Sequence, residues 1–128
     1  MNDEQLLQLI TQNISAPFPP EISQEKFNDL VYLAITKDKR EALWRLAFNY
    51  CGKNKDFSLI EDYFIAKRDD YYLVELVHAV QQDMNIMRLV EKVKQTKDKE
   101  FIAKLVERGK NDGLLDDSDV ERLSLFNE

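Results

Sequence analysis

The sequence repeats its pattern of apolar residues at an interval of about thirty residues, and this repeat constrains the fold more than any other feature. A first set of aligned positions comprises Phe27, Phe57 and Met87, then Leu30, Ile60 and Val90, then Leu33, Tyr63 and Val93. A second set comprises Leu43, Leu73 and Ile102, then Leu46, Leu76 and Leu105, then Ala47, Val77 and Val106, with one residue deleted in the third copy. The members of a copy follow at i, i+3 and i+6 or at i, i+3 and i+4, which places them on one helical face. The repeat therefore predicts three copies of a helical hairpin.

The segments that join the two helices of each copy are also alike, and they comprise residues 36–39, 66–69 and 96–99. Asp38, followed by Glu41 three positions later, predicts a capping box, in which the Asp side chain accepts a hydrogen bond from a free backbone N–H. Asp98, and either Asp69 or Asp70, are predicted to cap the equivalent helices. The similarity of these connectors supports a true repeat over a chance alignment of amphipathic helices.

These patterns predict an all-α fold. The expected helices span residues 3–14, 24–36, 39–51, 57–67, 70–83, 86–95 and 98–108, with a short final helix near 118–126. Successive prolines at 17, 19 and 20 block helix formation, so they separate the first helix from the repeats. The apolar stripe of that helix is expected to cap the first hairpin, and it consists of Leu6, Leu7, Ile10 and Ile14.

We interpret the chain as one domain with three parts. Residues 1–22 form the N-terminal helix and Pro-rich linker, residues 23–110 form the hairpin repeats, and residues 111–128 form an acidic C-terminal segment. Over residues 27–108 the pattern resembles a short α-solenoid of the HEAT-like type, although the repeat is shorter than is usual for that family. The tetratricopeptide signature is not reproduced.

The charge of the chain is negative overall but alternates along the sequence. The net charge is −6, which argues against general nucleic-acid binding because such binding neutralises phosphates with Lys and Arg. Residues 37–55 carry +4, residues 56–83 carry −5, and residues 84–110 carry +4. A single cysteine, an acidic start without a leader and the lack of a long apolar run predict a cytoplasmic protein with no membrane partner.

The sequence offers no recognisable catalytic, cofactor or metal site, so we expect a protein that is not an enzyme. His78 is the only histidine and has no companions at metal-ligand spacing, and we predict a structural place for it at a seam between hairpins. A nucleophilic pair of Cys51 and His78 is a weaker alternative, since nothing marks an oxyanion hole. The lysines between 92 and 104 form either a solvated face or, as an alternative, an RNA-contacting patch.

The best candidate for a contact surface is an acidic and aromatic group of residues, because tyrosines are common interface anchors and carboxylates suit a basic partner. Its members are Glu61, Asp62, Asp69, Asp70, Tyr71, Tyr72 and Glu75. Tyr71 and Tyr72 replace polar or small residues of the first copy, so at least one of them is expected to be exposed.

Through residues 69–78, DDYYLVELVH, which combine acidic and aromatic side chains, the chain resembles the α-helical immunity proteins of contact-dependent and other polymorphic bacterial toxin systems. The resemblance implies a stoichiometric inhibitor that docks on a cognate toxin, often a basic nuclease, and blocks its active site. An adaptor or regulatory subunit with the same scaffold is the alternative, and a small RNA-binding protein is a third. No small-molecule substrate is expected.

Overall fold

The computed structural model describes residues 2–12, 19–80, 86–118 and 120–121. In these parts the chain contains seven α-helices and no strand, so the all-α prediction is confirmed. The helices are α1 (Asp3–Thr11), α2 (Gln24–Thr36), α3 (Arg40–Asn49), α4 (Ser58–Ala66), α5 (Asp70–Val80), α6 (Ile86–Lys94) and α7 (Lys99–Asn111). Ile14 and most of the helix predicted near 118–126 lie outside the described residues.

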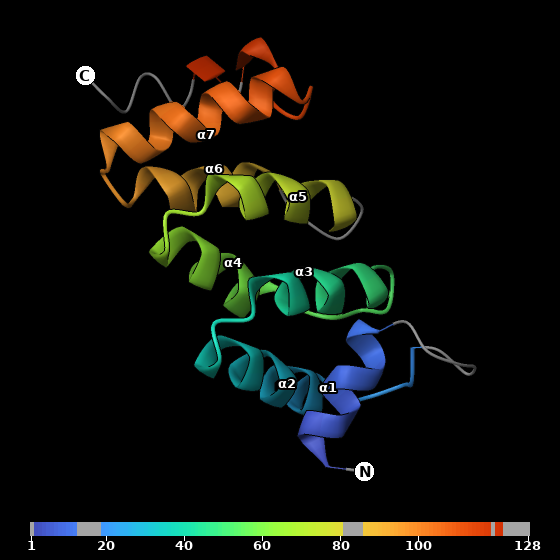
Figure 1. Ribbon diagram of the computed structural model, residues 1–128. Helices are drawn as coiled ribbons and strands as arrows, with labels where there is room; N and C mark the ends of the chain where they lie inside the picture. The colour runs from blue at the N-terminus through green and yellow to red at the C-terminus, as the bar shows by residue number, and fades with distance from the viewer. Residues whose placement is uncertain (1, 13–18, 81–85, 119, 122–128) are drawn as a thin grey trace.

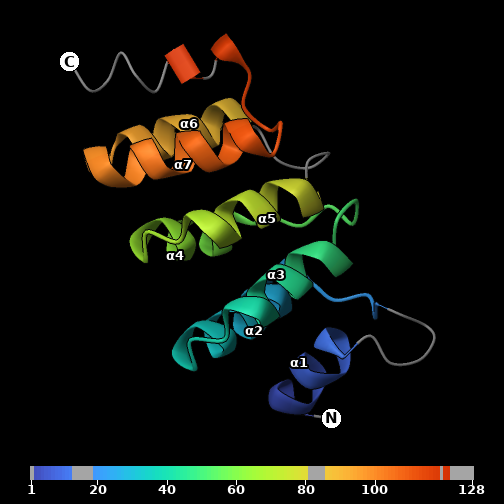
Figure 2. The same ribbon diagram turned by 45° about the horizontal axis from the view of Figure 1, so that its top comes forward.

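The helices α2 and α3, α4 and α5, and α6 and α7 form three successive hairpins that lie one above another, with α1 and α7 at opposite ends of the stack (Figures 1 and 2). Between hairpins, α3 packs against α5, α5 against α7, and α2 against α4. Helix α1 packs against both α2 and α3, where it buries Leu7 and Ile10. Each hairpin therefore buries apolar side chains against the next one.

Most of the aligned apolar positions form one continuous buried cluster, and Leu33, Tyr63 and Val106 pack against it partly buried. Leu43, Leu73 and Ile102 occupy equivalent places on α3, α5 and α7, and each is 0% exposed. Leu30 and Ile60 are equally buried on α2 and α4. Burial of each such side chain contributes roughly 1.5–3 kcal/mol, so packing is the main stabilising term of the stack.

The connectors repeat in backbone geometry as well as in sequence. Asp38, Arg68 and Lys97 each have a left-handed backbone, with φ of 49°, 53° and 56°. In the first two connectors the hydrogen bonds are equivalent, since the N–H groups of Asp38 and Arg68 both donate to the carbonyl three residues earlier. The next N–H of each donates five residues back, which closes the end of the preceding helix.

This geometry overturns the predicted capping box at Asp38. The N-cap residue of α3 is Lys39, which makes no capping hydrogen bond with its side chain. Because Asp38 is part of the left-handed turn, its carboxylate instead accepts hydrogen bonds from Arg40 Nε at 3.2 Å and from the Tyr63 hydroxyl. The predicted cap at Asp98 is confirmed by a 3.0 Å hydrogen bond from the Phe101 amide.

Candidate functional site

Opposite charges that are about one repeat apart in the sequence pair between adjacent hairpins. Arg40 Nη1 lies 2.7 Å from Asp69 Oδ2, and Arg68 Nε lies 2.9 Å from Asp98 Oδ2. Within the acidic stretch of residues 56–83, four carboxylates face a basic residue of the hairpin before or after them, and these are Glu61, Asp62, Asp69 and Asp70.

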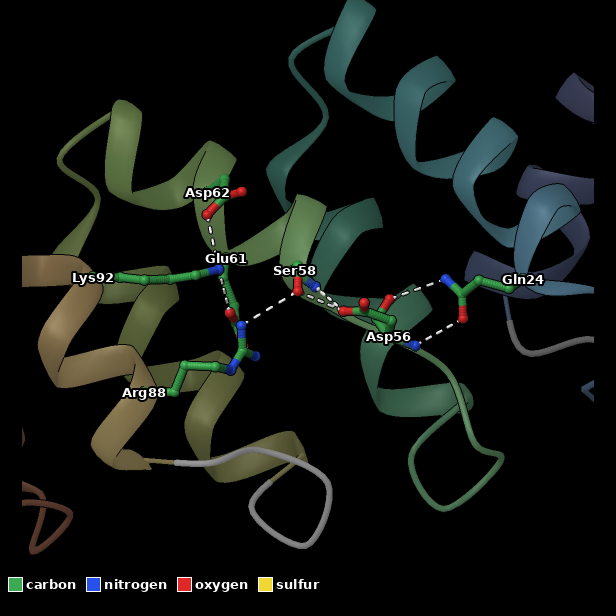
Figure 3. A network of polar contacts seen from close by, with 7 residues as sticks. All are labelled: Gln24, Asp56, Ser58, Glu61, Asp62, Arg88 and Lys92. Carbon is green, nitrogen blue, oxygen red and sulfur yellow. Dashed lines mark hydrogen bonds and ion pairs between the residues drawn. The ribbon is translucent and has the colours of Figure 1, made fainter.

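Glu61 is the clearest example, because its carboxylate is buried. The residue is 1% exposed, and its oxygens accept hydrogen bonds from Arg88 Nη2 at 3.0 Å and Lys92 Nζ at 2.9 Å (Figure 3). Both cations come from α6, so the contacts join the second hairpin to the third. A buried carboxylate is strongly disfavoured unless it is paired in this way. We had predicted that Glu61 contacts a partner, but its burial leaves it no surface for such a contact.

Lys92 binds a second carboxylate, and this affects its pKa. Its ammonium lies 2.9 Å from Asp62 Oδ1 as well as from Glu61. Burial lowers the pKa of Lys92, whereas the hydrogen bonds to Asp62 and Glu61 raise it. The hydrogen bonds and charges of the two carboxylates together outweigh burial, so the pKa of Lys92 lies above its ordinary value. Lys92 is therefore charged at neutral pH and holds both acidic groups.

The same polar network continues to the first hairpin. Gln24 on α2 accepts a hydrogen bond from the Asp56 N–H at 2.8 Å and donates one to the Asp56 carbonyl at 3.1 Å (Figure 3). The Asp56 carboxylate accepts hydrogen bonds from the hydroxyl and the amide of Ser58, and these hydrogen bonds lower its pKa. Arg88 reaches Ser58 Oγ at 3.3 Å, so the network links α2, α4 and α6 along one side of the stack.

Most of the remaining predicted contact residues are also engaged within the chain. Asp69 is bound to Arg40 and caps α5 through the Tyr72 amide at 3.0 Å, while Asp70 lies 2.6 Å from Arg108 Nε. The Tyr72 ring stacks on Phe64 with centroids 5.4 Å apart. These side chains hold α5 between its neighbours.

Two of the predicted residues, Tyr71 and Glu75, lie on the surface of α5. Tyr71 is 50% exposed, as expected for at least one of the two tyrosines, although the Arg108 guanidinium lies 5.6 Å from its ring centroid. Glu75 is partly exposed and forms no ion pair with another described residue. Because they are four residues apart, both lie on the same face of the helix.

Beside Glu75 lies an aromatic pair that the sequence analysis did not propose as a surface. The rings of Trp44 and Phe48 on α3 are nearly parallel, with centroids 5.4 Å apart and an interplanar angle of 19°. The Trp44 indole N–H donates to the Glu75 carbonyl at 3.0 Å, which places the pair beside α5. We call Trp44, Phe48, Tyr71 and Glu75 the aromatic face.

The position of His78 differs from the prediction. It was expected at a seam between hairpins, but it is exposed, as is Phe48, its equivalent in the first repeat, which is 51% exposed. His78 Nε2 lies 3.8 Å from Asp112 Oδ2, so its near neighbour is a carboxylate on the surface. Val74, four residues earlier on the same helix, is buried and only 3% exposed.

The described residues contain no group of three or more His, Cys, Asp or Glu side chains arranged to hold a metal ion.

The lysines between 92 and 104 do not act as one free basic patch, because several of them lie near carboxylates. Lys92 is in the buried network, Lys94 lies 3.7 Å from Glu91, and Lys104 lies 3.8 Å from Glu100. None of the helices in the described parts of the chain has the length and apolar character that crossing a membrane requires.

No family model matches this chain, and no curated protein or solved structure is similar to it.

Proposed function

We propose that this chain is a non-catalytic protein-binding module that binds its partner through the aromatic face. The observation that carries the proposal is the exposure of Phe48 and Tyr71 on adjacent helices. Among the described residues only three large hydrophobic side chains are exposed, and these are two of them. The third, Tyr32, lies on α2.

Aromatic side chains of this kind are suited to a protein interface. A stacked pair such as Trp44 and Phe48 loses little conformational freedom on binding and offers a large rigid surface. Interface residues that dominate affinity are most often Trp, Tyr and Arg near the centre of the contact. The Trp44 ring is fixed by its hydrogen bond to the Glu75 carbonyl, so the surface is formed before a partner arrives.

The surroundings of the aromatic face are charged, which gives it the polar rim of an interface. Arg45 is paired with Glu41 on α3, and Arg108 is paired with Asp70 at the start of α5. These pairs are partly exposed and can exchange partners at little cost, since exposed ion pairs contribute about 0–1 kcal/mol.

For the identity of the partner, we propose a bacterial toxin domain that the chain neutralises by covering its active site. The support is the resemblance to α-helical immunity proteins and the net charge of −6, which would speed association with a basic toxin. Many carboxylates between residues 56 and 83 bind cations within the chain, so we expect the net negative charge to act on the partner mainly at long range. An adaptor with another protein partner would use the same face.

The test begins with capture of the partner from the native host by the full tagged chain. Dissociation constants are then measured for wild-type protein, Phe48→Ala, Tyr71→Ala and the control Tyr32→Ala. We expect each of the first two to weaken binding by about thirtyfold, which corresponds to roughly 2 kcal/mol at an interface hot spot. Equal affinity of Phe48→Ala and Tyr32→Ala would contradict the proposal. A toxin is identified if the captured protein loses its activity at equimolar chain.

A further inference from the structure

We propose that the aromatic face holds an arginine side chain of the partner, with the guanidinium lying on the Phe48 ring and paired with the Glu75 carboxylate. This inference rests on the proposed function and adds the chemistry of the group that is recognised. Three features of the described residues carry it.

The first feature is the polarity of the aromatic pair. The only polar group of Trp44 is its indole N–H, and this is already bound to the Glu75 carbonyl at 3.0 Å. Phe48 has no polar group and is 51% exposed. What the pair offers to a ligand is therefore the face of an aromatic ring, which attracts cations through its quadrupole.

The second feature is the state of the Glu75 carboxylate. Asp69 and Asp70, at the start of the same helix, are each bound to an arginine of a neighbouring hairpin. Glu75, whose carbonyl adjoins Trp44, has no such cation among the described residues. Its backbone is therefore fixed against Trp44, and its partly exposed carboxylate provides the charge that complements a guanidinium.

The third feature is that this chain already binds arginine twice with the same combination of groups. The Arg108 guanidinium lies 5.6 Å from the Tyr71 ring centroid while its Nε binds Asp70 at 2.6 Å. In the same way the Arg68 guanidinium lies 5.5 Å from the Phe101 ring centroid while its Nε binds Asp98 at 2.9 Å.

An arginine of the partner on the aromatic face would repeat this combination of an aromatic ring and a carboxylate. Phe48 and Trp44 supply the ring, and Glu75 supplies the carboxylate. Arginine is preferred to lysine because its planar guanidinium stacks on a ring and still donates hydrogen bonds in the ring plane.

Trp44 makes the inference directly testable, because it is the only tryptophan in the sequence. The full ¹⁵N-labelled chain is titrated with acetyl-tetra-arginine amide, and the indole N–H resonance of Trp44 is followed. A lysine peptide of equal length and charge is the matched ligand. The protein variants are Glu75→Gln, Phe48→Ala and the control Glu25→Gln, which removes an exposed carboxylate on α2.

We expect a saturable shift of the indole resonance with the arginine peptide and binding about fivefold weaker in Glu75→Gln, while Glu25→Gln stays near wild type. Phe48→Ala should weaken binding to a similar extent, and the lysine peptide should bind less tightly than the arginine peptide. A non-saturable shift, or equal affinity of Glu75→Gln and Glu25→Gln, would overturn the inference.

The same variants separate this inference from the proposed function. If the captured partner requires Phe48 but binds Glu75→Gln as tightly as wild type, the aromatic face is an interface that does not hold an arginine. If the partner does not require Phe48, the proposed function itself is wrong.

Discussion

The buried carboxylate of Glu61 gives a direct measure of how strongly the second and third hairpins are held together. Replacing Glu61 with Gln keeps its shape but removes the charge that Arg88 and Lys92 bind at 3.0 and 2.9 Å. Removing one partner of a buried ion pair costs about 3–5 kcal/mol when the remaining charge stays buried. Here the side chains of Arg88 and Lys92 are 43% and 22% exposed, so both regain water, and Lys92 keeps Asp62. We therefore expect a loss of about 2 kcal/mol, within the range for hydrogen bonds to charged groups.

Urea unfolding followed by circular dichroism measures this loss. With a typical slope of about 2 kcal/mol per molar urea, the midpoint should fall by roughly 1 M. The control Glu25→Gln, on the exposed side of α2, should stay within about 0.5 kcal/mol of wild type. Replacing Glu61 and Lys92 together with Leu should restore part of the stability, because the desolvation of the buried carboxylate and of the less exposed of its two cations is then avoided. If Glu61→Gln matches Glu25→Gln, the ion pairs do not contribute to the fold as we argue.

Three further changes test other parts of the structure. Leu73→Ala should lower the free energy of unfolding by about 3 kcal/mol in the same urea assay, because Leu73 is 0% exposed in the centre of the stack. The control Tyr32→Ala should lower it by less than about 0.5 kcal/mol. Similar losses for the two variants would contradict the assigned core. The pKa of Asp98 is lowered by the amide that it caps and by an arginine, so its stabilising effect is complete above about pH 3.9 and is lost as the pH falls through the lowered pKa. Asp98→Asn should therefore lose less stability than wild type on acidification below pH 4, and parallel pH profiles would exclude this role. A Cβ added at Gly109 would lie 2.7 Å from Leu115 Cδ1. Gly109→Ala should therefore cost less stability in a Leu115→Ala background than in wild type. Additive effects of the two substitutions would show that residues 109 and 115 do not touch.

The helices and the core could be predicted from the sequence because both follow from apolar periodicity. The helix expected at residues 24–36 has the same bounds as α2, and the aligned Leu43, Leu73 and Ile102 are all fully buried. Periodicity is a local property of each helix, and stacking then buries the same positions in every copy. This is why the repeat was sufficient to predict them.

The polar contacts were harder to predict because they depend on how the hairpins stack. Glu61 was assigned to a surface because of its charge, but its partners lie 27 and 31 residues later on another helix. The alternating charge of the sequence contained this information, since opposite charges one repeat apart meet when hairpins stack. At Asp38 the local pattern of a capping box was misleading, because the left-handed backbone of the connector directs its carboxylate to Arg40 and Tyr63.

The candidate site was predicted in part. Tyr71 and Glu75 lie on the exposed side of α5, as the acidic and aromatic pattern suggested. Trp44 and Phe48 were not predicted as surface residues, because large aromatic side chains on an amphipathic helix are most often buried. Only the packing of α3 against α5 shows that Phe48 remains outside while Val74 is enclosed.

The central claim, that the aromatic face binds the partner, is tested most directly by hydroxyl-radical footprinting of the chain with and without its captured partner. Tyr32, Phe48 and Tyr71 are the large hydrophobic residues exposed in the described parts of the chain, so all three should be oxidised in the free protein. We predict that the partner protects Phe48 and Tyr71 and leaves Tyr32 unchanged. Protection of Tyr32 alone, or oxidation of Phe48 and Tyr71 at the same rate in the complex, would contradict the claim.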